Sequence, residues 1–217
     1  MKYIFILLAC CIGSELSAQF NSKVGYVASY HNFDAVNTIF EQYNDNNSFD
    51  KDLEDMHLLH GLQLGVRYRV SNVSLEAGVT TGTATSEAVG IVNEARQDIR
   101  WKASSFDYHL GLTQHINTIG LGAILTRTRV SMKEFNAVSG DFVDVTRSHN
   151  MGLKVFFQWE VPGAYTSFAI RPFYQFMFDS YDHAPVSARL VPNYGGPTDD
   201  NLRMFGLSVL FFNGTQP

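Results

Sequence analysis

Acidic, basic and amide side chains recur two residues apart in several stretches of the chain, as in Asp107 and His109 or Gln158 and Glu160. Alternate residues of a β-strand project from the same face, so each pair would line one side of a strand. Carboxylates beside Lys, Arg or His can form buried ion pairs, and a row of such groups can also pass protons. The candidate polar network comprises Arg67, Arg69, Glu76, Asp107, His109, Lys154, Gln158, Glu160, Arg171 and Gln175.

The residues between these polar positions are mostly apolar, which indicates strands with two unlike faces. In the clearest stretch, from Met151 to Val161, apolar residues occupy every odd position, while Lys154, Gln158 and Glu160 occupy even ones. Eight stretches of this kind are expected, at 23–30, 58–70, from 73, at about 101–116, from 119, and at 151–161, 167–178 and 201–212.

The connections between these stretches alternate in length. Turn residues predict short connections at 71–72, at 117–118 and around 162–164. Outer-membrane barrels combine short periplasmic turns with longer external loops. The predicted fold class is all-β: an eight-stranded antiparallel up-and-down transmembrane β-barrel with short helical content in the first long loop. The expected long loops span 31–57, about 85–100, 135–148 and 179–200.

The alternation does not itself decide whether the apolar faces point outward to lipid or inward, as in a soluble lipocalin-like barrel. Most stretches reach the 9–11 residues, approximately, that a tilted membrane strand needs. Aromatic residues also gather near the strand ends, where two interfacial belts would lie. These features favour the membrane barrel, with a soluble barrel or sandwich as the alternative. The expected lipid-facing girdle is Tyr30, Tyr68, Trp101, Trp159, Phe168, Phe178 and Phe211.

An eight-stranded barrel encloses about enough space for side chains to fill. Arg67 and Glu76 lie symmetrically about the Ser71-Asn72 turn, so hairpin pairing places them opposite each other and predicts a direct ion pair. Because a buried charge without its partner costs about 3–5 kcal/mol, we predict a plugged, charge-paired interior without an open channel. The alternative is a narrow porin-like transporter of small or apolar solutes, or a proton path along these charges.

Residues 1–18 have the pattern of a cleavable signal peptide, with Lys2, an apolar segment and small residues before Ala18. Cleavage there leaves one barrel domain, 19–217. The alternative is a lipobox at 7–10, which would make Cys10 a lipidated N-terminus.

The composition excludes two classes. No apolar run of about 18 residues follows the signal peptide, so no membrane-spanning helix is predicted. A formal net charge of -5 does not provide the broad basic footprint of a nucleic-acid-binding protein.

The first long loop, 31–57, is the most distinctive connection. Val36, Ile39, Phe40 and Tyr43 recur at helical spacing and predict a short amphipathic helix. Asp50 is placed to cap a second helix that would hold Leu53 and Met56. The loop is strongly acidic, which suggests a solvated face or a docking element for a protein partner. Its carboxylates lack the glycine and spacing of a calcium-binding EF-hand loop.

Catalytic chemistry has only weak candidates. Ser148-His149, Asp182-His183, His57 and His60 fall near the expected outer rim. Adjacent residues on a strand face opposite ways, so neither dipeptide forms a ready dyad. No nucleophile elbow, zinc motif, phosphate loop or dinucleotide fingerprint occurs. We predict no enzyme, no catalytic or metal-binding residue and no cofactor.

A family resemblance rests on Val24-Gly25-Tyr26, the stretch from His60 to Arg69, and Leu75-Glu76. These residues resemble small outer-membrane β-barrel proteins of Bacteroidota, which are porin-like proteins of the OmpA/OmpX type. The resemblance covers roughly the whole mature chain and implies an outer-membrane location, contact with outer-membrane lipid and insertion by the barrel assembly machinery. It carries over no catalytic residue. We therefore expect an integral outer-membrane protein with a structural or interaction role exercised through its external loops.

Overall fold

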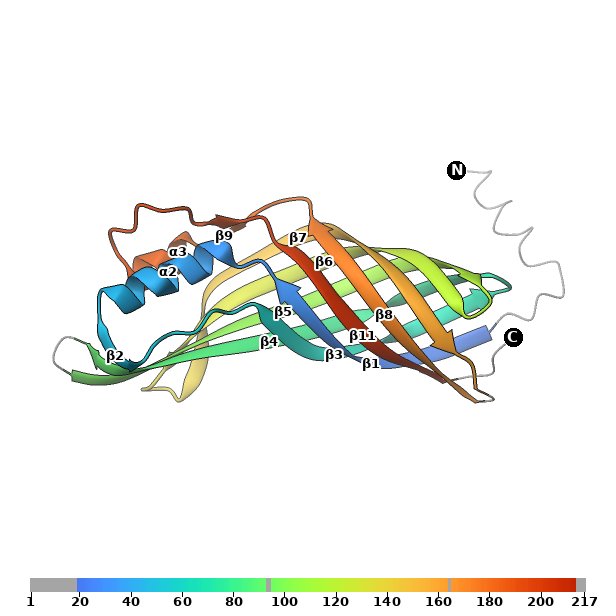
Figure 1. Cartoon of the computed structure of the whole chain (residues 1–217), viewed down its shortest axis with the longest axis horizontal. Helices are drawn as coiled ribbons and strands as arrows, with labels where there is room; N and C mark the ends of the chain where they lie inside the picture. The colour runs from blue at the N-terminus through green and yellow to red at the C-terminus, as the bar shows by residue number, and fades with distance from the viewer. Residues whose placement is uncertain (1–18, 93–94, 164, 214–217) are drawn as a thin grey trace.

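The main element of the protein is a closed barrel of eight antiparallel strands, as predicted (Figure 1). The computed structural model describes residues 19–92, 95–163 and 165–213. The predicted signal peptide, with both cysteines, lies outside them. The barrel strands are β1 (Gln19–His31), β3 (Leu58–Val70), β4 (Val73–Val92), β5 (Ala95–Ile116), β6 (Ile119–Asn136), β7 (Asp141–Val161), β8 (Thr166–Met177) and β11 (Arg203–Asn213).

Hydrogen bonding between the first and last barrel strands closes the cylinder. β1 pairs with β11 on one side and with β3 on the other, and the remaining strands pair with their neighbours in the chain. The predicted hairpin turns at 71–72 and 117–118 are confirmed. Ser71 and Asn117 adopt positive φ values of 51° and 55°, the left-handed conformation that two-residue hairpins with the proper twist require. We call the end with these short turns the turn end.

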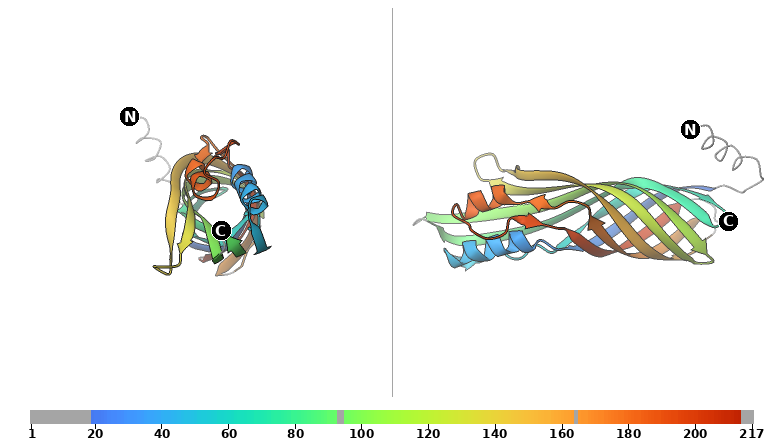
Figure 2. Two further views of the ribbon diagram at one scale, coloured as in Figure 1. Left: turned by 90° about the vertical axis from the view of Figure 1, so that its left-hand side faces the viewer. Right: turned by 90° about the horizontal axis from the view of Figure 1, so that it is seen from above.

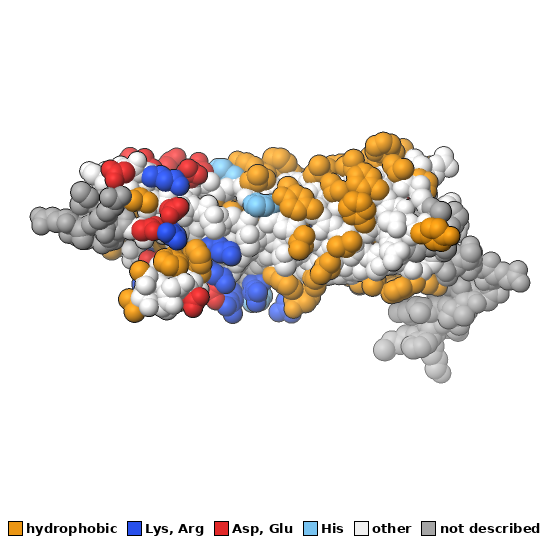
Figure 3. Space-filling view, turned by 90° about the horizontal axis from the view of Figure 1, so that it is seen from below, with side chains coloured by type: hydrophobic (Ala, Val, Ile, Leu, Met, Phe, Trp, Pro, Cys, Tyr) orange, Lys and Arg blue, Asp and Glu red, His pale blue; other side chains and the backbone are white. Residues whose placement is uncertain are grey.

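The two faces of the barrel wall have opposite character. Along β7, Lys154 and Glu160 are at most 5% exposed, whereas Phe157 is 41% and Trp159 is 50% exposed. The same alternation runs along β3, where Gln63 is buried between exposed leucines. In the segments 58–70 and 151–161, most apolar side chains therefore point away from the barrel axis, and the ionised side chains of Arg67, Lys154 and Glu160 point toward it. Apolar surface covers much of the face shown in Figure 3, toward the turn end.

Four neighbouring strands are much longer than predicted. β4 to β7 have 18 to 22 residues each, while the other four barrel strands have 11 to 13. The expected loops at 85–100 and 135–148 are therefore wrong, because these residues mostly extend two hairpins. Most of their outward side chains are polar, as in a loop, but the inward side chain of Ala88 is fully buried, and Ile99 packs against the same buried hydrophobic cluster. The hydrogen bonds between these strands continue because an apolar part of the chain covers that inner face.

The covering element is a cap formed by residues 32–57 and 178–202. It contains α2 (Asp34–Asp45) and α3 (Ala184–Leu190), which lie on the concave side of the extended strands (Figure 2). The helix predicted from the 3.6-residue spacing is thereby confirmed as α2. Short strands β2 (Ser48–Lys51), β9 (Tyr181–Asp182) and β10 (Asp199–Asp200) complete the cap, with β2 paired to β4. No helix in the described part of the chain is long and apolar enough to cross a membrane.

The cap and the extended strands share one hydrophobic core. Phe40 of α2 packs against Trp101 of β5 with ring centroids 6.0 Å apart, and both side chains are fully buried. Leu190 and Val186 of α3 belong to the same cluster as Val130 and Met132 of β6. The end of the barrel away from the short turns, which we call the cap end, is thus filled by apolar packing.

The second predicted helix is wrong. Residues 52–57 have no regular structure, although Leu53 and Met56 are buried in the cap. Two asparagines of α2 bind this segment. Asn44 accepts from the Leu53 amide (3.0 Å) and donates to its carbonyl (3.0 Å), and the Asn37 side chain accepts from the Met56 amide (3.0 Å). These side chains satisfy backbone groups that a helix would otherwise satisfy internally.

Candidate functional site

Inside the barrel, Glu76 of β4 lies between two cations. Its carboxylate accepts two bonds from Arg171 of β8, at 3.0 and 2.7 Å, and one from Lys23 of β1 at 2.9 Å. The relative exposure of all three side chains is 1% or less. The Lys23 ammonium also lies 3.2 Å from Nε2 of His109. One carboxylate is therefore shared by two cations from two other strands.

A second ion pair lies nearby, between Arg67 of β3 and Glu160 of β7. Nη1 of Arg67 donates to Glu160 at 2.8 Å, and the guanidinium lies 3.7 Å from the centre of the Phe212 ring. Glu160 also accepts from Gln158 at 2.8 Å and from Ser167 at 2.7 Å. Both carboxylate oxygens are thus occupied, which is how a buried charge is tolerated.

These contacts correct the predicted ion pair between Arg67 and Glu76. The two residues are backbone partners, as the hairpin geometry required, but their side chains bind other residues. Side chains on the inner wall converge on the barrel axis, so a long Arg or Lys side chain reaches across the cylinder. Register along one hairpin does not reveal those partners.

Nearer the cap, Lys154 of β7 lies 3.9 Å from the Asp107 carboxylate and 4.5 Å from the centre of the Phe173 ring. Gln175 donates to the hydroxyls of Thr126 and Thr128 at 3.1 and 3.2 Å. A cavity of about 10 Å³ beside Asp107, Lys154 and Gln175 has room for about one water molecule.

The structure places nine of the ten predicted network residues on the inner wall and buries them. Arg69 is the exception. It is half-exposed at the turn end, where it donates to the Ser71 carbonyl at 3.2 Å. The network also contains members that the sequence analysis did not select, although each follows from alternation within its own strand: Asn21, Lys23, Gln63, Thr113, His115 and Ser167.

The predicted girdle needs one correction. Trp101 is fully buried under α2 and does not face outward. Its position has the same parity as Asp107 and His109, which already indicated the inner face. Tyr30 and Phe168 are half-buried, with Tyr30 stacked between Phe205 (4.9 Å) and His57 (4.7 Å). The other four are 45–57% exposed: Tyr68, Trp159, Phe178 and Phe211.

The histidine candidates take three different places. His183 does not act with Asp182; its Nε2 lies 3.3 Å from Asp200, and both side chains are buried. Asp200 also accepts from the Ala35 amide at 2.8 Å, which caps α2 from another segment. Asp200 therefore joins the two segments of the cap, 32–57 and 178–202. His57 and His60 lie near Tyr30 and Tyr26, and His149 is exposed on the outer wall.

The cap carries a cleft of about 630 Å³ between the end of α2, the end of α3 and the edge of the extended strands. Amide side chains of Gln42, Asn46 and Asn193 line it together with Tyr43. Burial and the Glu134 carboxylate raise the pKa of the Tyr43 phenol, which favours the neutral hydroxyl. Arg189 lies 3.9 Å from Glu134 across the cleft. Hydrogen-bonding groups therefore surround a concave surface at the cap end.

The residues that the structure describes contain no group of three or more His, Cys, Asp or Glu side chains positioned to hold a metal ion. In the cap loop, Asp50, Asp52, Glu54 and Asp55 are all exposed. The acidic segment therefore presents separate carboxylates to solvent.

Comparisons with known proteins give only distant structural matches. No family model matches the sequence, and no curated protein matches it. Among solved structures, Ail, the attachment invasion locus protein of Yersinia pestis, crystallised with the heparin analogue sucrose octasulfate, is 13% identical, with a TM-score of 0.47; the alignment covers 91% of this chain and 98% of that one. Neisserial surface protein A is 12% identical, with the same coverages and a TM-score of 0.45. The translocator domain of the autotransporter NalP from Neisseria meningitidis is 3% identical over 100% of this chain and 94% of that one, with a TM-score of 0.31.

Proposed function

We propose that this protein is an integral outer-membrane β-barrel that presents its cap to the exterior as an interaction module. The observation that carries the proposal is the division of the molecule into two unlike parts. One part has an apolar outer wall and a charged, internally bonded interior. The other has a polar outer surface, its own hydrophobic core and a cleft.

The membrane location is supported by the reversed polarity of the barrel. Leu62, Leu110 and Leu112 are 55–59% exposed, whereas charged side chains such as Arg67 and Glu160 are buried in the interior. In water this arrangement would expose a wide apolar surface, but in lipid it removes that surface from water. Fractionation of envelope membranes, combined with gel migration before and after boiling, tests it. A band that sediments with the outer membrane and shifts on boiling is expected, and a soluble protein without a shift would contradict the proposal.

The interior is proposed to be closed to solutes. The ion pairs of Glu76 and Glu160 cross the barrel and join five different strands, and the cap packs over the other end. Single-channel recording in planar bilayers should remain silent. A steady ohmic conductance would instead support a narrow transporter.

The cap is the proposed binding module because it is both folded and exposed. Acidic side chains cover its outer side, including Glu41 and Asp45 of α2, and the amide-lined cleft lies beside them. A basic extracellular protein fits this charge. Nothing in the barrel requires these acids, since neither forms an ion pair with any described residue.

Binding can be tested with biotinylated protein in vesicles exposed to secreted and surface proteins of the same cells. We expect the variant Glu41→Lys/Asp45→Lys to lose a salt-sensitive partner that the wild type retains. The matched control is Asp141→Lys, which changes an exposed acid on the β6–β7 hairpin. Equal capture by all three proteins would exclude the acidic face of α2 as the docking surface.

A further inference from the structure

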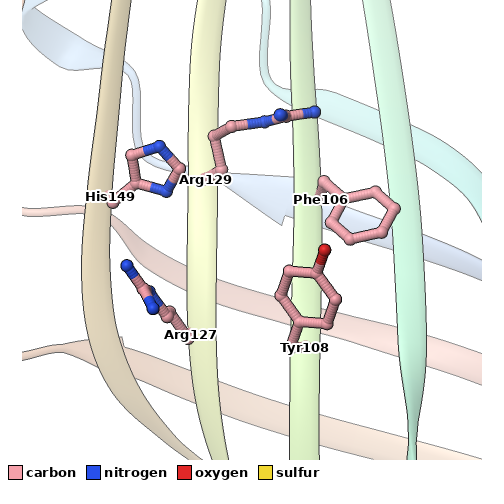
Figure 4. Close-up of a pocket in the computed structure, with 5 residues that line it drawn as sticks. All are labelled: Phe106, Tyr108, Arg127, Arg129 and His149. Atoms are coloured by element: carbon pink, nitrogen blue, oxygen red, sulfur yellow. The ribbon is translucent and has the colours of Figure 1, made fainter.

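The outer wall of the barrel carries a cleft that the interior network and the cap do not use. It has a volume of about 290 Å³ and is lined by Phe106 and Tyr108 of β5, Arg127 and Arg129 of β6, and His149 of β7 (Figure 4). The pairing of the three strands explains why these five residues lie together. Arg129 is paired with Phe106 on one side and His149 on the other, and Arg127 is paired with Tyr108. Two cations and three rings thus share one face of three adjacent strands.

The two arginines have no carboxylate partner among the residues that the structure describes. The guanidinium of Arg129 lies 5.6 Å from the centre of the Phe106 ring, and no acidic side chain lies within salt-bridge distance of Arg127 or Arg129. Exposed arginines farther toward the cap are different: Arg100 binds Asp98 and Glu87, and Arg147 binds Asp144. The cleft therefore holds a local excess of positive charge.

The cleft lies at a defined height along the barrel axis. The paired row next to it toward the turn end consists of Leu110, Leu125 and Leu153, and the row beyond it toward the cap consists of Ser104, Ser131 and Arg147. Arg129 follows Ile119, the first residue of β6, by ten residues. With about 3.3 Å per residue and a tilt of about 40°, Arg129 lies about 25 Å along the barrel axis from the turn end. That distance equals the height, about 25 Å, of the apolar band in outer-membrane barrels.

Basic side chains also gather where the hydrophobic surface ends on the face shown in Figure 3. A charge is costly in the middle of the lipid face but tolerated near its edge, where it meets headgroups. Guanidinium groups bind phosphate through paired hydrogen bonds, and the Tyr108 hydroxyl and the His149 ring add further polar atoms. The leucine row below offers an apolar track for acyl chains.

We propose that this cleft binds the phosphate group of a phosphorylated lipid in the outer leaflet, with the lipid chains lying along the Leu110–Leu125–Leu153 row. The inference rests on the membrane location proposed above. It assigns the cleft to the lipid that surrounds the barrel and leaves the cap free for a protein partner.

The test uses the full mature chain in vesicles of digalactosyldiacylglycerol, a lipid without phosphate, that contain either bis-phosphorylated lipid A or its dephosphorylated form. Native mass spectrometry of the extracted protein counts the retained lipid. We expect the wild type to retain the phosphorylated lipid at least about tenfold better than the dephosphorylated one, and Arg127→Gln/Arg129→Gln to lose that preference. The matched control Arg147→Gln, on the adjacent strand, should keep it.

Further measurements distinguish a lipid site from a free-anion site and from a protein that does not insert into the membrane. Inorganic phosphate added at the lipid concentration should not displace the lipid; displacement would show a free-anion site and overturn the lipid assignment. The comparison of two lipids on the wild type needs no variant, so it decides the matter even if the double variant fails to fold. A wild-type barrel that shows heat-modifiable migration and vesicle insertion, yet retains both lipids equally, overturns this inference alone. A wild type that does not insert overturns the membrane location itself.

Discussion

Removing the charge of Glu76 should destabilise the barrel more than any other isosteric change on the inner wall. Glu76→Gln keeps the shape and one acceptor oxygen but leaves the Lys23 ammonium and the Arg171 guanidinium without their shared carboxylate. Three hydrogen bonds of 2.7–3.0 Å hold these groups in the native barrel, and the three side chains have essentially no exposed surface. Breaking a buried ion pair from one side costs about 3–5 kcal/mol.

The expected loss is near the lower end of that range, about 3 kcal/mol, because Arg171 keeps its bonds to Gln158. Urea unfolding in vesicles, followed by tryptophan fluorescence and by the gel shift on boiling, measures the free energy of unfolding. Trp101 lies beneath the cap and Trp159 near the turn end, so the fluorescence of each, measured in a variant that lacks the other, reports on one end of the barrel.

A triple replacement tests whether the loss of stability comes from the unpaired cations. Lys23→Met/Glu76→Leu/Arg171→Met removes all three charges at once and should recover most of the loss, since an apolar core of similar volume is often as stable as a buried ion pair. If Glu76→Gln lowers the free energy of unfolding by less than about 1 kcal/mol, water reaches these cations and the interior is not closed.

Three further changes should act on the cap and the wall. Asp200→Ala removes the acceptor for the Ala35 amide and should cost about 1 kcal/mol, seen as faster hydrogen exchange throughout α2. Trp101→Ala should cost about 3–5 kcal/mol and should leave the cap sensitive to protease while the barrel stays folded, because it empties the space beneath Phe40. Gly122→Ala places a methyl group 2.3 Å from the Phe156 ring and 2.6 Å from a backbone carbonyl, so the melting temperature should fall.

Matched controls exist for each of these three changes. Asp199→Ala alters the exposed neighbour of Asp200, Tyr165→Ala removes an aromatic ring that is 79% exposed, and Gly195→Ala adds a methyl group with nothing within 4 Å. Each should leave its readout unchanged. A control that behaves like its partner would mean that the effect comes from general loss of stability and not from the named contact.

Side-chain alternation predicted the barrel and its two faces because it is a local property of a strand. Phe157 and Lys154 are separated by an odd number of residues, so their opposite orientation follows from the backbone alone. The same rule would have placed Trp101 inside and would have added Lys23 to the network. Trp101 was missed because its residue type was weighed over its parity, and Lys23 was missed because only the apolar face of its strand was considered.

The partners of the charges could not be predicted in the same way. The Arg67–Glu160 pair joins residues 93 positions apart on strands that are not neighbours in the sheet. Such a contact depends on the diameter of the cylinder and on which other side chains fill it. Those quantities belong to the whole barrel, and no single hairpin contains them.

The ends of the four long strands could not be predicted from the local sequence either. Outward residues such as Lys102, Lys133 and Asp144 look like loop residues, and only the apolar face of α2 explains why the hairpins stay paired beyond the barrel. Conversely, α2 was predictable because its own 3.6-residue spacing reveals a buried stripe. The segment 52–57 was not predictable, because two asparagine side chains of α2 replace its helical hydrogen bonds.

The bond from Ala35 to Asp200 spans 165 residues and therefore sets an order for assembly. The side chain that caps the amino terminus of α2 belongs to the segment that immediately precedes the last strand. Closing so long a loop is slow unless the intervening strands already hold its ends together. We therefore expect the cap to close only after the intervening strands have paired, so a chain stalled before that stage would expose the apolar face of α2.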